Sequence, residues 1–287
     1  MPDGATARPP GEVDLHMHST ASDGALAPAK VVDAARAVGL SAIALTDHDT
    51  LAGVAEAETA AAPFGIRVVT GVELSAHDGA KEIHLLALHV SRPSVIESRL
   101  SGFRDARETR ARDIVDKLRR LGVNVDLQAV MEEAAGGAVG RPHVARALIR
   151  GGHVRDTREA FDRFLGAGRP GFMPKARLDV SEAITLAHSA GAIAIWAHPG
   201  QEGRRERLEP LVSHGLDGVE VRHPSHNAED IKRLGALCDF FGLVPSGGSD
   251  WHGSGEGQRT IGCMHIPPAW LYQQDVVVAR RAAEEVA

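Results

Sequence analysis

The sequence predicts an α/β fold, a small seven-stranded β/α barrel that carries a helical insertion. Short runs rich in apolar and β-branched residues alternate with segments of helical periodicity over most of the 287 residues. This alternation stops between about residues 92 and 175, where only helical patterns occur. We therefore expect a barrel domain formed by residues 12–91 and 176–287, with residues 92–175 inserted. An open parallel sheet is the alternative arrangement.

The predicted elements follow one another in regular order. The expected strands are Val13–Leu15, Ala42–Thr46, Arg67–Gly71, Ile83–Val90, Ala192–Ala197, Gly218–Val221 and Leu243–Pro245. The expected barrel helices are Pro28–Val38, Leu51–Ala62, Val180–Ala190, Glu206–His214 and Asn227–Phe241. Gly39 and Gly191 follow two of these helices, where C-terminal glycines are common. Cys263 is expected in a short terminal strand.

The spacing of apolar residues in the insertion predicts a long amphipathic helix over Ser98–Leu121. Shorter helices are expected over Pro142–Arg150 and Thr157–Leu165. On the long helix, acidic residues precede basic residues by four positions, as in Glu108 and Arg112. Such pairs stabilise an exposed helix face. This face is therefore interpreted as solvated rather than as a surface for nucleic acid.

Composition limits the function classes. The apolar fraction is 43% and the charged fraction 24%, as in ordinary globular proteins, and the formal charge of −6 argues against broad capture of long nucleic acid. No apolar run has membrane-spanning length, and the first residues lack the apolar stretch of a signal peptide. The two cysteines give no disulfide framework, so a cytoplasmic location is expected.

Metal-binding residue types follow the carboxyl ends of five predicted strands. His16 and His18 are two residues apart on a strand, so both imidazoles can reach the same ion, and Asp23 follows in a turn. The other strand ends carry His48, Glu73, His198, and Asp250 with His252. Functional residues of β/α barrels gather at this rim. The pattern therefore predicts a cluster of divalent cations.

Neighbouring residues extend this prediction. Asp47 or Asp49 is placed to orient an imidazole. His84 begins its strand, and it would lie beside the end of the Glu73 strand if its own strand runs antiparallel. Nitrogen and oxygen ligands without thiolate suit Mn, Fe or Zn.

The blocks VDLHMHSTASDG, AIALTDHDT, GVELSA, EIHLLAL, AHPG and GGSDWHG, in this order between about residues 12 and 262, resemble the PHP (polymerase and histidinol phosphatase) family. The resemblance implies a distorted seven-stranded barrel and a cluster of usually three ions. It implies the following ligand sets: His16, His18, Glu73 and Asp250 for the first ion; Glu73, His84 and His198 for the second; Asp23, His48 and His252 for the third.

These ligands predict phosphate-ester hydrolysis. Two cations that share a carboxylate lower the pKa of a bridging water and bind phosphate oxygens, so in-line attack needs no Ser or Cys nucleophile. His16, His18, Glu73 and Asp250 would form the catalytic site. His223 or His226 could protonate the leaving group, with His226 the chosen candidate, although it could equally cap the following helix. Two or three ions are expected, with Mn first and Fe or Zn as alternatives.

Basic residues outside the rim are candidates for phosphate binding. Arg141 and His143 open a predicted helix, whose N-terminus favours anions; otherwise both side chains are simply solvated. Lys175 lies where the insertion returns to the barrel, and Arg222 follows a predicted strand.

The GRPH block, the insertion and the VEVRHPSH segment resemble one branch of the family. That branch includes phosphatases of nucleoside 3',5'-bisphosphates or nucleoside monophosphates, and enzymes that trim short RNA from the 5' end. Arg222 stands where the branch often has an aromatic residue. The negative charge and compact insertion favour a small nucleotide over long RNA, and neither a membrane nor an obligate protein partner is expected.

Four alternative functions would each require features that differ from those of this sequence. A histidinol-phosphate phosphatase would share the chemistry, but the GRPH insertion argues against it. The PHP domain of a DNA polymerase would be followed by a polymerase-sized region. A non-catalytic, metal-stabilised binding module would have lost ligands, and an amidohydrolase would leave the Asp23, His48 and His252 set without a purpose.

Overall fold

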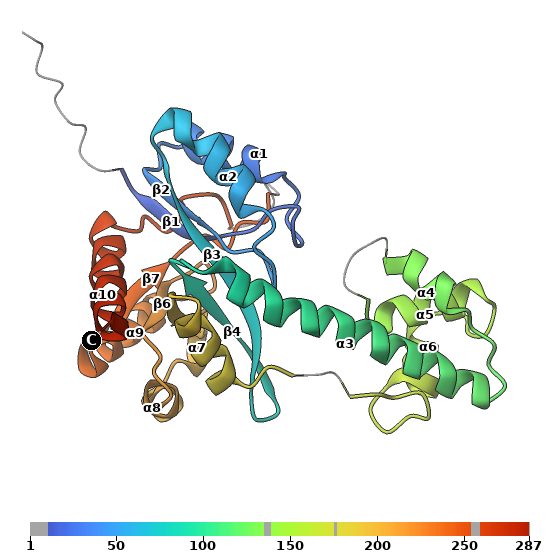
Figure 1. Cartoon of the computed structure of the whole chain (residues 1–287). Coiled ribbons are helices and arrows are strands. Elements are labelled where there is room, and N and C mark those ends of the chain that lie inside the picture. Colours follow the sequence, from blue (N-terminus) through green and yellow to red (C-terminus); the bar gives the residue numbers. More distant parts are fainter. Residues whose placement is uncertain (1–10, 135–138, 175–176, 254–258, 287) are drawn as a thin grey trace, which may run out of the picture. The chain divides into compact units, whose positions relative to one another are not determined.

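The computed structural model describes residues 11–134, 139–174, 177–253 and 259–286. It divides the chain into two compact units (Figure 1). The barrel unit comprises Met1–Glu97 and Leu178–Ala287, and the helical unit comprises Ser98–Arg177. The division falls several residues after the expected residue 92. The first turn of helix α3 belongs to the barrel unit, where Ile96 is fully buried and Glu97 accepts a hydrogen bond from the Leu51 amide.

A seven-stranded mixed sheet forms the barrel, with its strands in sequence order. Neighbouring strands are parallel except that β4 runs antiparallel to both β3 and β5. The strands are β1 (Val13–Met17), β2 (Ala42–Leu45), β3 (Arg67–Asp78), β4 (Lys81–Leu88), β5 (Ile193–Trp196), β6 (Gly218–Arg222) and β7 (Val244–Gly247). This architecture confirms the predicted distorted barrel and excludes the open parallel sheet.

The segment after β7 nearly closes the barrel by binding to β1. The Asp250 amide donates to the His16 carbonyl at 2.9 Å, and the His18 amide donates to the Trp251 carbonyl at 2.9 Å. Gly248 is required for this approach, because a Cβ there would lie 2.5 Å from the His16 backbone nitrogen. The loop that carries Asp250 is thus held directly against the strand that carries His16.

The β3–β4 hairpin is longer than expected. Residues 75–78 and 81–82 were expected in a connection, but they continue the ladder, which runs from Gly71↔Leu88 to Asp78↔Lys81. Only Gly79 and Ala80 remain to make the turn, and Gly79 adopts a φ of 60° there. The register places His84 opposite Ser75, two residues beyond Glu73 on the same face of the sheet.

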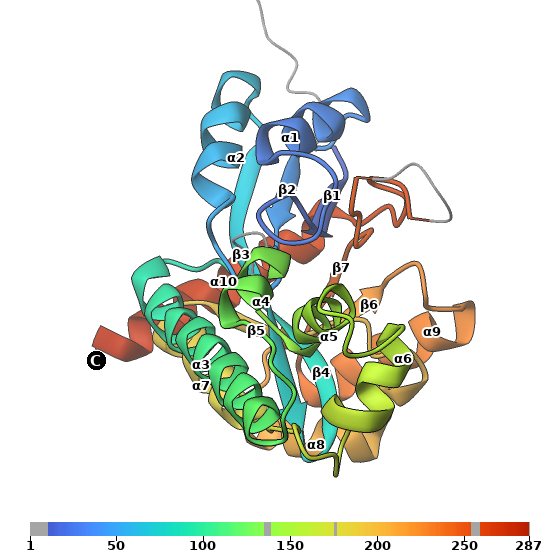
Figure 2. The ribbon, with the colours of Figure 1, turned by 90° about the vertical axis from the view of Figure 1, so that its right-hand side faces the viewer.

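Helices cover the barrel and surround its apolar interior. They are α1 (Pro28–Ala37), α2 (Val54–Ala61), α7 (Val180–Ser189), α8 (Arg205–Ser213), α9 (Ala228–Phe241) and α10 (Pro268–Val286), with short 3-10 turns at Ala62–Phe64 and Gly200–Glu202. Figure 2 shows α1 and α2 together beside β1, β2 and β3. One apolar cluster fills the space under α1 and α2, and another joins the strands to α10 through Leu271.

The C-terminal prediction was wrong. Residues 261–264 form turns rather than a strand, and Ile266 makes one isolated antiparallel bridge to Val13 before α10 begins. The two prolines at 267 and 268 follow this bridge, and Pro268 occupies the first helical position, where a missing amide hydrogen costs nothing.

The helical unit has its own apolar core. It contains α3 (Pro93–Arg120) from Ser98 onward, together with α4 (Leu127–Ala134), α5 (Arg141–Arg150), α6 (Thr157–Ala160) and a π-helical turn at Phe161–Leu165. Val115, Leu118, Val144 and Leu165 are fully buried in one cluster. No helix in the described part of either unit is long and apolar enough to cross a membrane.

Candidate metal centre

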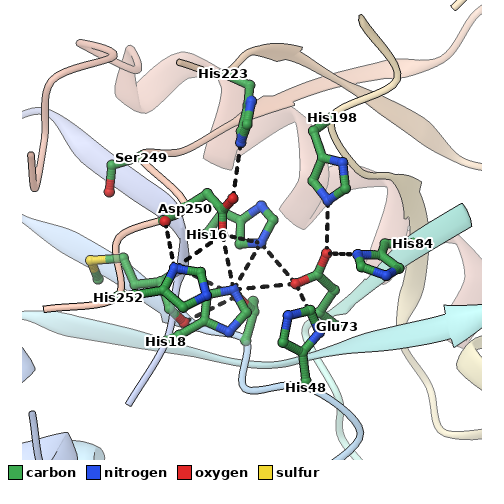
Figure 3. Close-up of polar contacts among 12 residues, drawn as sticks. His16, His18, His48, Glu73, His84, His198, His223, Ser249, Asp250 and His252 are labelled. Carbon is green, nitrogen blue, oxygen red and sulfur yellow. Dashed lines mark hydrogen bonds and ion pairs between the residues drawn. The ribbon is translucent and has the colours of Figure 1, made fainter. Parts of the chain in front are cut away.

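The predicted ligands come together at the carboxyl-terminal end of the barrel strands (Figure 3). His16 lies in β1, Glu73 in β3 and His84 in β4, while the others follow strand ends: Asp23, His18, His48, His198, Asp250 and His252. Glu73 reaches this rim because β3 continues past Thr70, the last residue paired with β2.

Glu73 is the centre of the cluster, and its side chain is only 1% exposed. Its Oε1 lies 2.8 Å from His84 Nδ1 and 2.9 Å from His198 Nε2. Its Oε2 lies 3.1 Å from His16 Nε2, 3.2 Å from His18 Nε2 and 3.3 Å from His48 Nδ1. Five ring nitrogens thus face two carboxylate oxygens, an arrangement that suits a carboxylate shared between cations.

Among the described residues, three groups hold ligand atoms within 4.8 Å of one another. The groups are His16, His18, Glu73 and Asp250; His48, Glu73 and His84; and His18, Asp23, His48 and His252. The first group equals the first family ligand set. The second has His48 where the family set has His198, and the third adds His18 to the family set.

The residues present fit divalent cations. All donor atoms are imidazole nitrogens or carboxylate oxygens, the set that Mn, Fe and Zn share. His18 Nδ1 is buried and has no hydrogen-bond partner. A buried polar atom without a partner costs stability. Asp23 Oδ1 lies 3.7 Å from this nitrogen, and a cation bound by both atoms would supply the partner.

Electrostatics keep the carboxylates ionised. Burial alone would raise the pKa of Glu73, but the charge and hydrogen bond of His16 hold it well below its usual range. Burial likewise opposes ionisation of Asp250, yet hydrogen bonds from His18 and His223 lower its pKa. Burial lowers the pKa of His16, and the charges of Glu220 and Glu73 outweigh that effect and raise it.

The backbone is strained where it presents ligands. His198 and Asp250 have φ values of 31° and 48°, and Asp49 beside His48 has 51°. Residues other than glycine rarely adopt this left-handed backbone conformation. Backbone strain of this kind clusters at functional sites. The abrupt ends of β5 and β7 therefore direct these side chains into the cluster.

Sequence reasoning missed the role of Glu220. Its Oε1 lies 3.1 Å from His16 Nδ1, and its Oε2 accepts a hydrogen bond from the His198 amide at 2.7 Å. It is fully buried in the middle of β6. By holding Nδ1, Glu220 turns His16 Nε2 toward Glu73, the usual role of a carboxylate behind a metal-binding histidine. The available signal was a charged residue within the apolar run of β6.

Asp47 and Asp49 hold backbone segments next to the cluster. Asp47 accepts hydrogen bonds from the Ser19 amide and hydroxyl, both at 2.7 Å, and from the Ser22 hydroxyl at 2.7 Å. It therefore fixes the loop that carries Asp23. Asp49 Oδ1 accepts from the Ser75 amide at 3.0 Å and ties the end of β2 to β3.

His223, rather than His226, contacts the cluster. His226 Nδ1 lies 3.0 Å from the Val221 carbonyl, and its Nε2 accepts from the Gly200 amide at 3.0 Å, so both ring nitrogens bind backbone. His226 does not cap α9, because Asn227 does. His223 Nε2 lies 3.2 Å from Asp250 Oδ2, and its ring is 1% exposed.

The described candidates for phosphate binding contact backbone groups of their own unit. Arg222 donates to the carbonyls of Met264 and His265. Within the helical unit, Arg141 donates to the Leu165 carbonyl at 3.1 Å, and His143 Nδ1 accepts from the Gly140 amide at 2.8 Å in a capping box of α5. Lys175 lies outside the described residues.

A cavity of 240 Å³ opens beside two of the ligands, His84 and His198. Its walls include Ile83, Trp196 and Pro199. Polar side chains also line it: Lys81, Glu82 and Glu202, of which Lys81 and Glu202 form an ion pair. The space can receive an uncharged, partly apolar group attached to a ligand bound at the cluster.

Comparisons with known proteins agree with this geometry. The sequence profile of the PHP domain matches residues 14–96. The chain is 35% identical to the 3',5'-nucleoside bisphosphate phosphatase of Chromobacterium violaceum, over 89% of this chain and 93% of that protein. It is 38% identical to the 5'-3' exoribonuclease of Haemophilus influenzae, over 83% of this chain and 89% of that protein.

Solved structures show the same fold. A protein from Bifidobacterium adolescentis, described as a metal-dependent phosphoesterase, is 30% identical with a TM-score of 0.68, covering 93% of this chain and 96% of that one. A Chromobacterium violaceum protein described as an amidohydrolase with bound sulfate is 33% identical with a TM-score of 0.66, covering 94% and 97%.

Proposed function

The chain belongs to the PHP family and is a metal-dependent phosphoesterase, and from this premise we propose that it hydrolyses a phosphate monoester of a nucleotide. The substrate would be a nucleoside 3',5'-bisphosphate or a nucleoside monophosphate. The observation that carries the proposal is the buried cluster around Glu73 with a cavity directly beside His84 and His198.

The family resemblance and the three ligand groups support two or three divalent cations, with Mn as our first choice and Fe or Zn as alternatives. Such cations lower the pKa of a coordinated water and offset the charge of a phosphate. The carboxylates and imidazoles of the predicted ligand sets supply the negative charge and the nitrogen donors that would hold these cations. His16, His18, Glu73 and Asp250 form the most buried of the groups and are our choice for the catalytic set.

His223 is our revised candidate for protonating the leaving oxygen. Its Nε2 points to Asp250 at the cluster, and its Nδ1 is held by the Ser225 hydroxyl at 2.7 Å. Both nitrogens of His226 bind backbone groups, so its proposed role is to hold the Gly200 turn, which follows His198, in place.

The cavity supports a nucleoside as the group that carries the phosphate. An apolar wall with carboxylates among its lining residues suits a base and sugar better than a second phosphate. Two similar proteins are named for nucleotide or RNA substrates, at 35% and 38% identity. We keep Arg141, His143, Lys175 and Arg222 as candidates for contacts to a second phosphate.

A 5'-3' exoribonuclease acting on short RNA is the second candidate, since the 38% identical Haemophilus influenzae protein has that name. The two free cysteines support a cytoplasmic location for either activity.

The experiment is a phosphate-release screen of the Mn-loaded protein. It compares a nucleoside 3',5'-bisphosphate, AMP, histidinol phosphate and short 5'-phosphorylated RNA at equal concentrations. We expect the highest kcat/KM for a mononucleotide. Preference for RNA that grows with chain length would favour the exoribonuclease, and preference for histidinol phosphate would contradict the proposal.

A further inference from the structure

We infer that Arg259 is a phosphate-binding residue of this site. Its guanidinium donates a hydrogen bond to an oxygen of the scissile phosphate at the Asp250 end of the cluster. The inference rests on the proposed phosphatase function, but it adds a residue to which neither the family ligand sets nor the candidate phosphate-binding residues gave a role. The ligand is a phosphate monoester dianion, or the orthophosphate released from it.

The two oxygens of the Asp250 carboxylate face different neighbours. Oδ1 lies 3.1 Å from His18 Nε2 and 3.5 Å from His16 Nε2, within the first ligand group. Oδ2 lies 2.7 Å from Arg259 Nη1 and 3.2 Å from His223 Nε2. The Arg259 guanidinium therefore contacts the most buried group of ligands through the second oxygen of Asp250.

Exposure distinguishes Arg259 from the groups around it. The Asp250 side chain is 8% exposed, whereas the Arg259 side chain is 47% exposed. The guanidinium is thus partly in solvent while it contacts a nearly buried ligand. Because the Asp250 carboxylate is nearly buried, its 2.7 Å contact with Nη1 restrains the guanidinium more than a contact between two fully exposed groups would.

The chemistry of the side chain suits this role. A guanidinium carries five N–H donors in a planar fork that matches two phosphate oxygens. Within the described part of the chain, one nitrogen of Arg259, Nη1, contacts Asp250. The rest of the fork can bind phosphate without releasing Asp250.

The position also fits the path of the substrate. The cavity lies at the His84 and His198 end, where both rings contact Glu73 Oε1. Asp250 lies beside His16 and His18, whose Nε2 atoms contact Oε2 (Figure 3). Arg259 binds the other oxygen of Asp250. A phosphate centred over Glu73 would direct its ester group toward the cavity and a free oxygen toward Arg259.

The test measures orthophosphate binding to the Mn-loaded protein by calorimetry, together with bound Mn per chain. The variants are Arg259→Ala and Arg259→Lys. Arg280→Ala is the matched control, because Arg280 is an exposed arginine on α10 whose partner, Glu284, lies 3.9 Å away. Orthophosphate binding does not depend on which nucleotide is the substrate, so the inference can hold even if the nucleotide assignment fails.

We expect Arg259→Ala to keep the wild-type Mn content and to weaken orthophosphate binding about tenfold or more, with a matching rise in KM. Arg259→Lys should lose less, because it keeps the charge but not the fork, and Arg280→Ala should match wild type. Unchanged phosphate affinity in both Arg259 variants would overturn the inference. Loss of Mn together with phosphate would also overturn it, since Arg259 would then only support Asp250.

Discussion

The barrel unit and the helical unit use the same kinds of ionisable side chain in opposite ways. In the barrel unit, His16, His18 and Glu73 are at most 1% exposed, and Glu73 is far from both histidines in the sequence. In the helical unit, Glu159 pairs with Arg155 at 3.0 Å and with Arg163 at 2.8 Å, one helical turn away on either side. Burial and long-range convergence therefore identify the functional cluster.

A perturbed pKa alone does not separate the two regions. The pKa of Glu159 is lowered to about 2 by hydrogen bonds from the Arg155 backbone and from the side chains of Arg155 and Arg163. The pKa of Glu73 is also held well below its usual range, but against the opposing effect of burial. Only Glu73 remains charged in an environment that disfavours charge, and a cation can stabilise it there.

The largest expected effect comes from Glu73→Gln. The variant removes the charge shared by all five imidazole contacts while keeping the shape of the side chain. We expect phosphate release to fall by more than about a hundredfold, beyond what residues behind metal ligands typically contribute, and bound metal to fall with it. Metal analysis and steady-state kinetics on the same sample check this; an active variant with full metal content would refute a central role for Glu73.

An intermediate effect is expected for Glu220→Gln. The amide can still accept from the His198 backbone, but it loses the charge that orients His16. We expect metal affinity or kcat to fall about ten- to a hundredfold, with the fold intact by circular dichroism. Wild-type metal affinity and kcat would show that Glu220 serves packing alone.

The smallest effect is expected for Glu159→Gln in the helical unit, which should leave kcat/KM unchanged and lower Tm slightly. The folded-state pKa of about 2 lies below the ordinary value of 4.5, so this pairing stabilises the fold above about pH 4.5 and is lost as pH falls toward 2. The Tm difference from wild type should therefore stay constant above about pH 5 and narrow as the pH falls from about 4.5 toward 2. A gap that widens on acidification would contradict the assigned cause.

The strand order and the converging ligands could be predicted because both follow from local pattern. His16 and His18 share a strand end by their spacing, and strand ends meet at one rim in any β/α barrel. Even the antiparallel β4 could be inferred, since His84 begins its strand where the other ligands end theirs.

The rest depends on how side chains turn within loops, which local pattern does not specify. Glu220 and Arg222 lie two residues apart in β6, yet the register shifts between them. Arg222 binds the His265 carbonyl, and Glu220 binds His16. Arg259 follows no strand and gave no signal. Helix α10 was not among the predicted elements.

Reconstitution after chelation tests the central claim most directly. Protein stripped of metal is titrated with Mn²⁺ while bound metal and release of phosphate from a nucleotide are followed together. We predict that the stripped protein is inactive, that at least two ions bind per chain, and that activity returns as they bind. A stripped protein that hydrolyses the ester as fast as the reconstituted one would contradict the claim that this cluster is the catalytic centre.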